Sequence, residues 1–177
     1  MNFESLQTPR LFLRKTTPEA YHHVFTSFTD EELKSYFGIT TDEELKKEKE
    51  QFQQGISTFN KSFLYFHLIH KTTNNVIGWC GFHTWYLKHD RAELGYVMNS
   101  EAHRGQGLMK EALTTVLQYG FNTMKLHRVE AFVGSDNMPS LRLLQQNRFV
   151  QEGVLREHYL VNSVYEDSLL YALLNRE

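Results

Sequence analysis

The residues best suited to bind a charged ligand form a glycine-containing turn ahead of a helix. Arg104-Gly105-Gln106-Gly107 precedes a segment in which apolar residues recur every three or four positions, the pattern of an amphipathic helix. The first N–H groups of a helix lack internal partners and attract negative charge. Glycines let a ligand approach the backbone, and arginine supplies donors suited to phosphate. The turn therefore predicts an anion site, although a purely structural turn would use the same residues.

Two nucleotide-binding signatures are missing from this turn. No Lys-Ser/Thr pair ends it, as an NTPase phosphate loop requires, and it lacks the three-glycine dinucleotide fingerprint and its parallel βαβ surroundings. The first absence argues against nucleotide hydrolysis, and a nucleotide-dependent enzyme that uses this turn stays a third alternative, which predicts stabilisation by ATP or NAD.

Other reactive side chains give weaker signals. Cys80 is the only cysteine, so no internal disulfide is possible, and its apolar neighbours in 76–82 predict a buried strand thiol. The nearby His83 is weak evidence for a base that would activate it. The nine histidines are scattered without a metal-binding spacing, so we expect no metal site.

The elements around the turn follow from sequence periodicity and helix-capping residues. Helices are expected to begin near Thr17, Asp30 and Thr41, the last running toward Phe59, and after Gly107. Asp136 or Asn137 is expected to cap a further helix. Strands are expected over 10–15, 62–70, 76–85, 91–98, 129–133, 148–152 and 163–173, the last two joined through 156–159. The sum predicts an α+β fold: a central mixed, mostly antiparallel sheet of six to seven strands with helices on both faces.

Composition limits the classes of function. The length of 177 residues predicts a single domain over 1–177. A net charge of −2 gives no general attraction to nucleic acid or to acidic membranes. No apolar run approaches the roughly 18 residues of a membrane span, and the first residues do not have the pattern of a signal peptide. We therefore expect a cytoplasmic protein, a monomer or homodimer, without nucleic-acid or membrane partners.

The motifs, taken in order along the chain, resemble the GNAT superfamily of acetyl-CoA-dependent N-acyltransferases. Arg104 to Met109 resembles its Gln/Arg-x-x-Gly-x-Gly/Ala pyrophosphate motif, residues 92–98 its fourth strand, and Asn137-Met138-Pro139-Ser140 its Asn-x-x-Ser helix. Residues 8–14 resemble the opening of the Rim-type branch, whose founders acetylate the N-termini of ribosomal proteins. There are two departures: Met109 replaces a small residue, and Arg148 stands where glycine is common, which leaves Asn147 as the expected left-handed helix cap.

This resemblance implies acetyl-CoA as the acetyl donor and direct transfer to an amine without an acyl-enzyme. It implies these residues as contacts of the donor: Val97, Met98, Arg104, Gly105, Gln106, Gly107, Leu108, Met109 and Asn137. Ser140 matches a hydroxyl that would protonate the departing thiolate, or it is an ordinary first-turn residue. Glu93 is the candidate base, directly or through water, or else an exposed carboxylate or the ion-pair partner of Arg91.

The acceptor that we expect is a protein N-terminal α-amine. Its pKa of about 7.8 makes deprotonation at about pH 7 cost roughly 1 kcal/mol, against roughly 4.6 kcal/mol for a lysine-like amine. The alternatives are a small amine, such as a polyamine, an amino acid or an antibiotic, and a CoA-binding protein without turnover. Acceptor contacts are expected from 28–37 and 157–164, which offer Tyr36, Phe37, His158 and Tyr159.

Overall fold

The computed structural model describes residues 3–55, 57–58 and 61–176. Its elements in chain order are β1 (Ser5–Gln7), β2 (Leu11–Thr16), α1 (Pro18–Ser27), α2 (Asp30–Phe37), α3 (Asp42–Gln54), β3 (Lys61–His70), β4 (Val76–Tyr86), β5 (Arg91–Met98), the short helix η1 (Glu101–His103), α4 (Leu108–Asn122), β6 (Arg128–Val133), α5 (Met138–Gln146), β7 (Val150–Val161) and β8 (Val164–Leu174).

The strands form one sheet in the order β1-β2-β3-β4-β5-β6-β8-β7. Every neighbouring pair is antiparallel except β5 and β6, which are parallel. The mixed, mostly antiparallel sheet is therefore confirmed. The predicted count of six to seven strands is too low, because the residues that the structure describes form a sheet of eight. The additional strand, β1, spans three residues, too few for an alternating pattern to stand out in the sequence.

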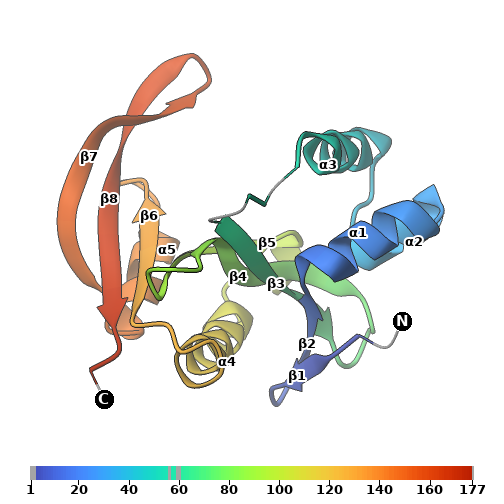
Figure 1. Ribbon diagram of the computed structural model, residues 1–177, viewed down its shortest axis with the longest axis horizontal. Helices are drawn as coiled ribbons and strands as arrows, with labels where there is room; N and C mark the ends of the chain where they lie inside the picture. Colours follow the sequence, from blue (N-terminus) through green and yellow to red (C-terminus); the bar gives the residue numbers. More distant parts are fainter. Residues whose placement is uncertain (1–2, 56, 59–60, 177) are drawn as a thin grey trace.

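Helices cover both faces of the sheet, as predicted (Figure 1). The larger core lies on the side of α4 and α5, where Leu113, Val116 and Leu144 pack with Phe66 and Phe82 of the strands. On the other side, α1, α2 and α3 cover a smaller core rich in aromatic rings, whose buried members are Tyr21, Val24, Leu33, Tyr36, Phe37, Leu45 and Phe63. The central strands thus separate two faces with different surroundings.

The helix starts follow the capping signals in the sequence. The side chain of Thr17 caps α1, with Pro18 in its first turn. The N-cap of α2 is Thr29 rather than Asp30, and both Thr29 and Thr41 form complete capping boxes. Helix α3 ends at Gln54, short of the predicted extent, and position 59 lies outside the described residues. In the described part of the chain no helix is both long and apolar enough to cross a membrane.

The last two strands differ from the prediction. Residues 156–159 do not connect two strands; they belong to β7, which pairs with β8 through two irregularities in register and forms a long hairpin that projects beyond the sheet (Figure 1). The expected left-handed cap at Asn147 is also wrong. Asn147 has φ −95°, and the next residue, Arg148, takes φ 64°. Arg148 turns the chain from the end of α5 toward β7, and Phe149, the residue just before β7, is buried.

Candidate functional site

The sheet opens between β5 and β6. Their parallel register joins Arg91, Ala92 and Glu93 to 128–130 and goes no further. Beyond Glu93, β5 continues to Met98 beside β4 alone. Backbone groups on that edge of β5 are therefore open to a ligand, which could pass from one face of the sheet to the other.

The backbone of β5 alternates in the direction it faces. The carbonyl oxygen of Val97 lies against Gly78 of β4, where a Cβ would come within 2.1 Å of it, and the N–H of Asn99 donates to Ile77 of β4 at 2.9 Å. The intervening groups, including those of Met98, consequently face the gap. Of the two residues predicted to hold the pantetheine arm, Met98 presents its backbone there. Val97 presents a side chain that is 44% exposed.

The predicted anion turn has the conformation that a backbone anion site needs. Gly105 and Gly107 adopt φ 72° and 76°, in the left-handed region that favours glycine. Gly107 is the N-cap of α4 and supplies no side chain to bond the first N–H groups of this 15-residue helix. Leu108 is buried and Met109 packs against the larger core. Only their backbones are therefore placed to meet a ligand, and the Met109 side chain is directed into the protein.

Arg10 holds this turn in place, a role that the sequence does not signal. Its Nη1 donates to the carbonyl of Gln106 at 2.9 Å, and its Nε pairs with Glu111 in the first turn of α4 at 2.8 Å. Thr8 donates to the same carboxylate at 2.5 Å. Arg104, in contrast, is exposed, and its hydrogen bonds to Met98 and Glu101 are long, 3.3 and 3.4 Å. Its guanidinium can therefore turn toward a phosphate at little cost.

Ser140 and Asn137 meet at the start of α5. The Asn137 side-chain oxygen accepts from the Ser140 N–H at 3.2 Å, so Asn137 is the helix cap and its amide nitrogen remains for a ligand. The Ser140 hydroxyl lies 2.5 Å from the hydroxyl of Tyr96 on β5. Burial raises the pKa of Tyr96 to about 12, so near neutral pH both hydroxyls carry their protons. This pair can pass a proton to a group that arrives through the gap.

Glu93 lies on the opposite face of the sheet. Its partner is not Arg91, which pairs with Glu130 at 2.7 Å. A Glu93 carboxylate oxygen lies 3.2 Å from Nε2 of His83, and the side chains are 16% and 32% exposed. The register of β4 shifts between Phe82, which pairs with Leu94, and Thr84, which pairs with Glu93, so His83 lies in the irregular stretch next to Glu93. A carboxylate beside an imidazole can accept a proton from an incoming amine.

Strand alternation explains how these groups divide between the two faces. Leu94 is buried in the core beneath α4 and α5, and Tyr96 packs against the same core. Glu93 and Val97, at the odd-numbered positions, project toward the side of α1 to α3. The two hydroxyls and the Glu93–His83 pair thus lie on opposite sides of the gap between β5 and β6.

The residues predicted to meet the acceptor are separated by the structure. Tyr36 is buried and its hydroxyl lies 2.9 Å from the Thr16 hydroxyl, so it belongs to the core. Phe37 lines a pocket beneath α3. Tyr159 of β7 is 48% exposed, and its pKa is raised by burial and by the charge of Glu93. The projecting hairpin therefore reaches the neighbourhood of Glu93.

Cys80 is fully buried, as predicted, and burial raises the pKa of its thiol. Among the residues that the structure describes, no group of three or more His, Cys, Asp or Glu side chains is placed to hold a metal ion.

Comparison with known proteins agrees with this geometry. Residues 10–150 match the family described as "Acetyltransferase (GNAT) domain". The chain is 32% identical over 173 residues to the uncharacterized N-acetyltransferase YoaA of Bacillus subtilis, covering 97% of both chains. It is 33% identical over 81 residues to a ribosomal-protein-serine acetyltransferase of Escherichia coli, covering 46% of this chain and 45% of that one.

Solved structures show the same fold. A dodecameric spermidine N-acetyltransferase from Vibrio cholerae superposes with a TM-score of 0.66 at 22% identity, covering 93% of this chain and 94% of that one. The family model spans most of the chain, and the relative YoaA matches it almost from end to end. The chain therefore belongs to the GNAT acetyltransferases, enzymes that transfer an acetyl group from acetyl-CoA to an amine.

Proposed function

We propose that this enzyme acetylates the N-terminal α-amine of a polypeptide that binds on the α1–α3 side of the gap between β5 and β6. The observation that carries this proposal is the Glu93–His83 pair, a partly exposed base beside an open stretch of β5. An α-amine with a pKa of about 7.8 needs only roughly 1 kcal/mol to lose its proton at about pH 7. A partly exposed carboxylate such as Glu93 is therefore a strong enough base for an α-amine acceptor. The likeness to a ribosomal-protein-serine acetyltransferase supports the same acceptor class.

The donor would bind from the side of α4 and α5. Its pyrophosphate would meet the N–H groups at Gly105, Gly107 and the start of α4, with Arg104 turned toward it. Its pantetheine arm would follow the backbone edge of β5 at Met98, with the amide of Asn137 nearby. The thioester would then lie in the gap, between the two sets of side chains.

Direct transfer from the ammonium form needs two protons to leave the nitrogen and one to reach the sulfur. The ammonium gives its first proton to Glu93, with His83 as the partner of that carboxylate. The neutral nitrogen then attacks the thioester carbon, the new C–N bond forms, the C–S bond breaks, and the nitrogen loses its second proton to solvent. The departing thiolate takes the proton of the Ser140 hydroxyl. Ser140 recovers a proton from Tyr96, whose hydroxyl is 2.5 Å away, and Tyr96 from solvent.

A small amine is the second candidate acceptor. A pocket beneath α3 contains carboxylate and aromatic side chains, and the V. cholerae neighbour acts on spermidine. A small amine could reach the same face of β5 as a polypeptide. It would use the same base and the same proton donor.

The test is to measure CoA release with three acceptor classes: peptides beginning with serine or alanine, the same peptides with a blocked N-terminus, and simple diamines. The proposal predicts turnover of the unblocked peptides and loss of turnover on blocking. Turnover of diamines alone would favour the second candidate. CoA binding without release for any acceptor would instead indicate a binding protein.

A further inference from the structure

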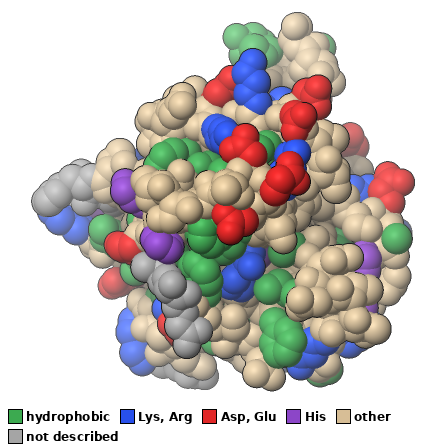
Figure 2. Space-filling model, turned by 90° about the vertical axis from the view of Figure 1, so that its right-hand side faces the viewer, with side chains coloured by type: hydrophobic (Ala, Val, Ile, Leu, Met, Phe, Trp, Pro, Cys, Tyr) green, Lys and Arg blue, Asp and Glu red, His purple; other side chains and the backbone are tan. Residues whose placement is uncertain are grey.

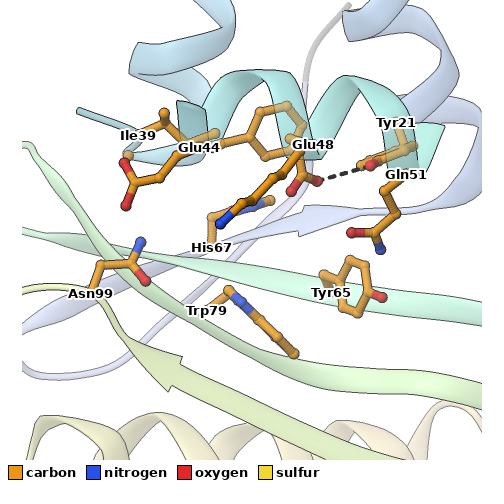
Figure 3. Close-up of a pocket in the computed structure, with 12 residues that line it drawn as sticks. Tyr21, Ile39, Glu44, Glu48, Gln51, Tyr65, His67, Trp79 and Asn99 are labelled. Carbon is orange, nitrogen blue, oxygen red and sulfur yellow. Dashed lines mark hydrogen bonds between the residues drawn. The ribbon is translucent and has the colours of Figure 1, made fainter. Parts of the chain in front are cut away.

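A pocket of about 300 Å³ lies between α3 and the strands β3 and β4 (Figure 3). Its lining includes Phe37 and three aromatic residues with polar groups: Tyr21 from α1, Tyr65 from β3 and Trp79 from β4. The rings of Tyr65 and Trp79 lie 5.0 Å apart at an angle of 55°. Glu48 of α3 points toward these rings from above. A carboxylate thus faces aromatic walls in a confined space.

The carboxylate of Glu48 is only partly satisfied by the protein. It accepts one hydrogen bond, at 2.8 Å, from the hydroxyl of Tyr21. A carboxylate can accept several more. Burial raises the pKa of Glu48, and the charge of Glu48 in turn contributes to raising the pKa of Tyr65 to about 12. Ionised Glu48 is therefore held where a positive charge would relieve its desolvation.

The other charged and polar groups limit what the pocket can accept. His67 forms part of the lining, and burial and nearby Arg14 lower its pKa to about 3, so it adds no positive charge near neutral pH. Glu44 and Lys47 also line the pocket, and both are exposed. Figure 2 shows acidic side chains, with Lys and Arg side chains among them, over this side of the molecule. An anion would meet the carboxylates of Glu44 and Glu48, and an apolar group would leave Glu48 with no partner beyond the Tyr21 hydroxyl.

A cation would gain from both kinds of neighbour. A carboxylate gives it a charge-assisted hydrogen bond, and the faces of Tyr and Trp rings attract positive charge. An alkylammonium group offers three donors on a flexible apolar stem that can pack between rings.

The pocket adjoins the part of β5 where the proposed function places the reacting amine. Trp79 lines the pocket, and its ring also packs over Gly95, where a Cβ would come within 2.9 Å of it. The same Cβ would come within 2.6 Å of His83, the partner of Glu93. Strands β3 and β5 are separated by β4 alone, so Tyr65 and Glu93 lie on strands roughly 10 Å apart.

We propose that this pocket is a subsite for a second, non-reacting alkylammonium group of the acceptor. This inference rests on the proposed function for the position of the reacting amine. It specifies the acceptor class: a molecule with one amine over β5 and another positive charge roughly 10 Å away. A lysine side chain in the second or third position of a polypeptide meets this condition, and so does a diamine of suitable length.

The test compares matched acceptors on the wild-type enzyme and on Glu48→Gln. One pair is a serine-initiated peptide with lysine at position two and its norleucine counterpart, which has no charge. The other pair is a diamine and the monoamine of equal length. The wild type is expected to favour the charged member of at least one pair by about tenfold or more in kcat/KM, the order expected for a hydrogen bond to a charged group. Glu48→Gln is expected to abolish that preference.

Glu50→Gln is the matched control, because Glu50 lies on the same helix, outside the pocket, and pairs with Lys46 at 3.9 Å. It should keep the preference. Lys47→Ala should increase the preference, because it removes a competing positive charge. Glu48→Gln keeps an acceptor for the Tyr21 hydroxyl and removes a buried charge, so its melting temperature should not fall below that of the wild type.

The two possible carriers of the second alkylammonium group, a peptide lysine and a small diamine, give different results in this test. Preference within the peptide pair identifies a lysine side chain, and preference confined to the amine pair identifies a small diamine. Equal rates within both pairs, or a preference that survives in Glu48→Gln, would overturn the inference. If no acceptor turns over, the proposed function fails, and calorimetric titration with the lysine peptide and the diamine still decides the subsite: binding lost in Glu48→Gln supports it, and absence of binding rejects it.

Discussion

The hydroxyls of Ser140 and Tyr96 are the proposed source of the proton for the departing thiolate. Replacing Ser140 with alanine removes the donor and is expected to lower kcat by about 100-fold, the usual contribution of a positioned acid. The KM for acetyl-CoA should change much less, because the backbone contacts to the donor remain. Steady-state kinetics with acetyl-CoA and an acceptor peptide measure both.

Ser27→Ala is a suitable control, since Ser27 is exposed and lies at the end of α1, on the face of the sheet opposite to Ser140. Tyr96→Phe should show an intermediate loss, because the Ser140 hydroxyl remains and loses only its partner. An unchanged kcat for Ser140→Ala throughout the pH range of activity would exclude Ser140 as the donor.

Glu93 is the proposed base. In Glu93→Gln, kcat/KM for an α-amine acceptor is expected to fall by roughly 10- to 100-fold near pH 7. The loss should shrink as the pH rises above about 7.8, because the amine is then already neutral. A pH–rate profile of both proteins tests this, with Glu43→Gln, an exposed position on α3, as the control.

A profile for Glu93→Gln that runs parallel to that of the wild type would contradict this role. Glu93 would then be a structural partner of His83, and the amine would lose its proton to solvent.

The turn before α4 is an element whose function depends on its backbone. Arg104→Ala is expected to weaken acetyl-CoA binding about tenfold or more, since hydrogen bonds to charged groups contribute roughly 1.5–3 kcal/mol. Raised salt should narrow the difference between variant and wild type, because the lost contact is electrostatic. Calorimetric titration with acetyl-CoA at two ionic strengths checks both expectations. Lys110→Ala, which removes a positive charge from the next turn, is the control, and equal weakening in the two variants would show that the charge acts without a specific contact.

Much of the framework around this turn could be predicted from sequence, because the signals are local. The capping threonines and Pro18 begin helices by hydrogen bonds within one turn. The alternation of apolar and polar residues predicted the central strands, because this signal also lies within a few consecutive residues. Arg104, Gly105 and Gly107 could be proposed as donor contacts from sequence because a turn and the following helix are adjacent in the chain.

Contacts between distant segments could not be predicted in this way. Arg10 lies 96 residues from Gln106, whose carbonyl it binds. The Glu93–His83 pair depends on the register between β4 and β5, which the sequences of the two strands do not specify. The sequence identified Tyr96 only as a strand residue. Its proximity to Ser140 depends on how α5 packs against the sheet, which the sequence does not specify.

At the scale of the whole molecule, burial of His67 couples folding to pH. Its pKa is lowered to about 3, whereas in the unfolded chain it is about 6.5. The unfolded state therefore binds an additional proton between these values, and the free energy of unfolding should decrease as the pH falls through this window. The slope from this residue is at most about 1.4 kcal/mol per pH unit.

Denaturant unfolding at several pH values tests this expectation. His67→Gln removes the titrating group and should unfold with a weaker pH dependence between about pH 6.5 and 4, above the range where carboxylates dominate. His89→Gln, an exposed position in the turn between β4 and β5, is the control. Equal slopes for wild type and His67→Gln would show that His67 does not stay neutral in the fold.

In the proposed mechanism the donor lies on the side of α4 and α5, the acceptor lies on the side of α1 to α3, and they react in the gap between β5 and β6. The acceptor is proposed to be an α-amine. The most direct measurement is mass spectrometry of a serine-initiated peptide that contains one internal lysine, after incubation with the enzyme and acetyl-CoA. We expect acetylation of the N-terminal α-amine and an unmodified lysine. Acetylation of the lysine ε-amine, or of added diamines in preference to the peptide, would contradict it.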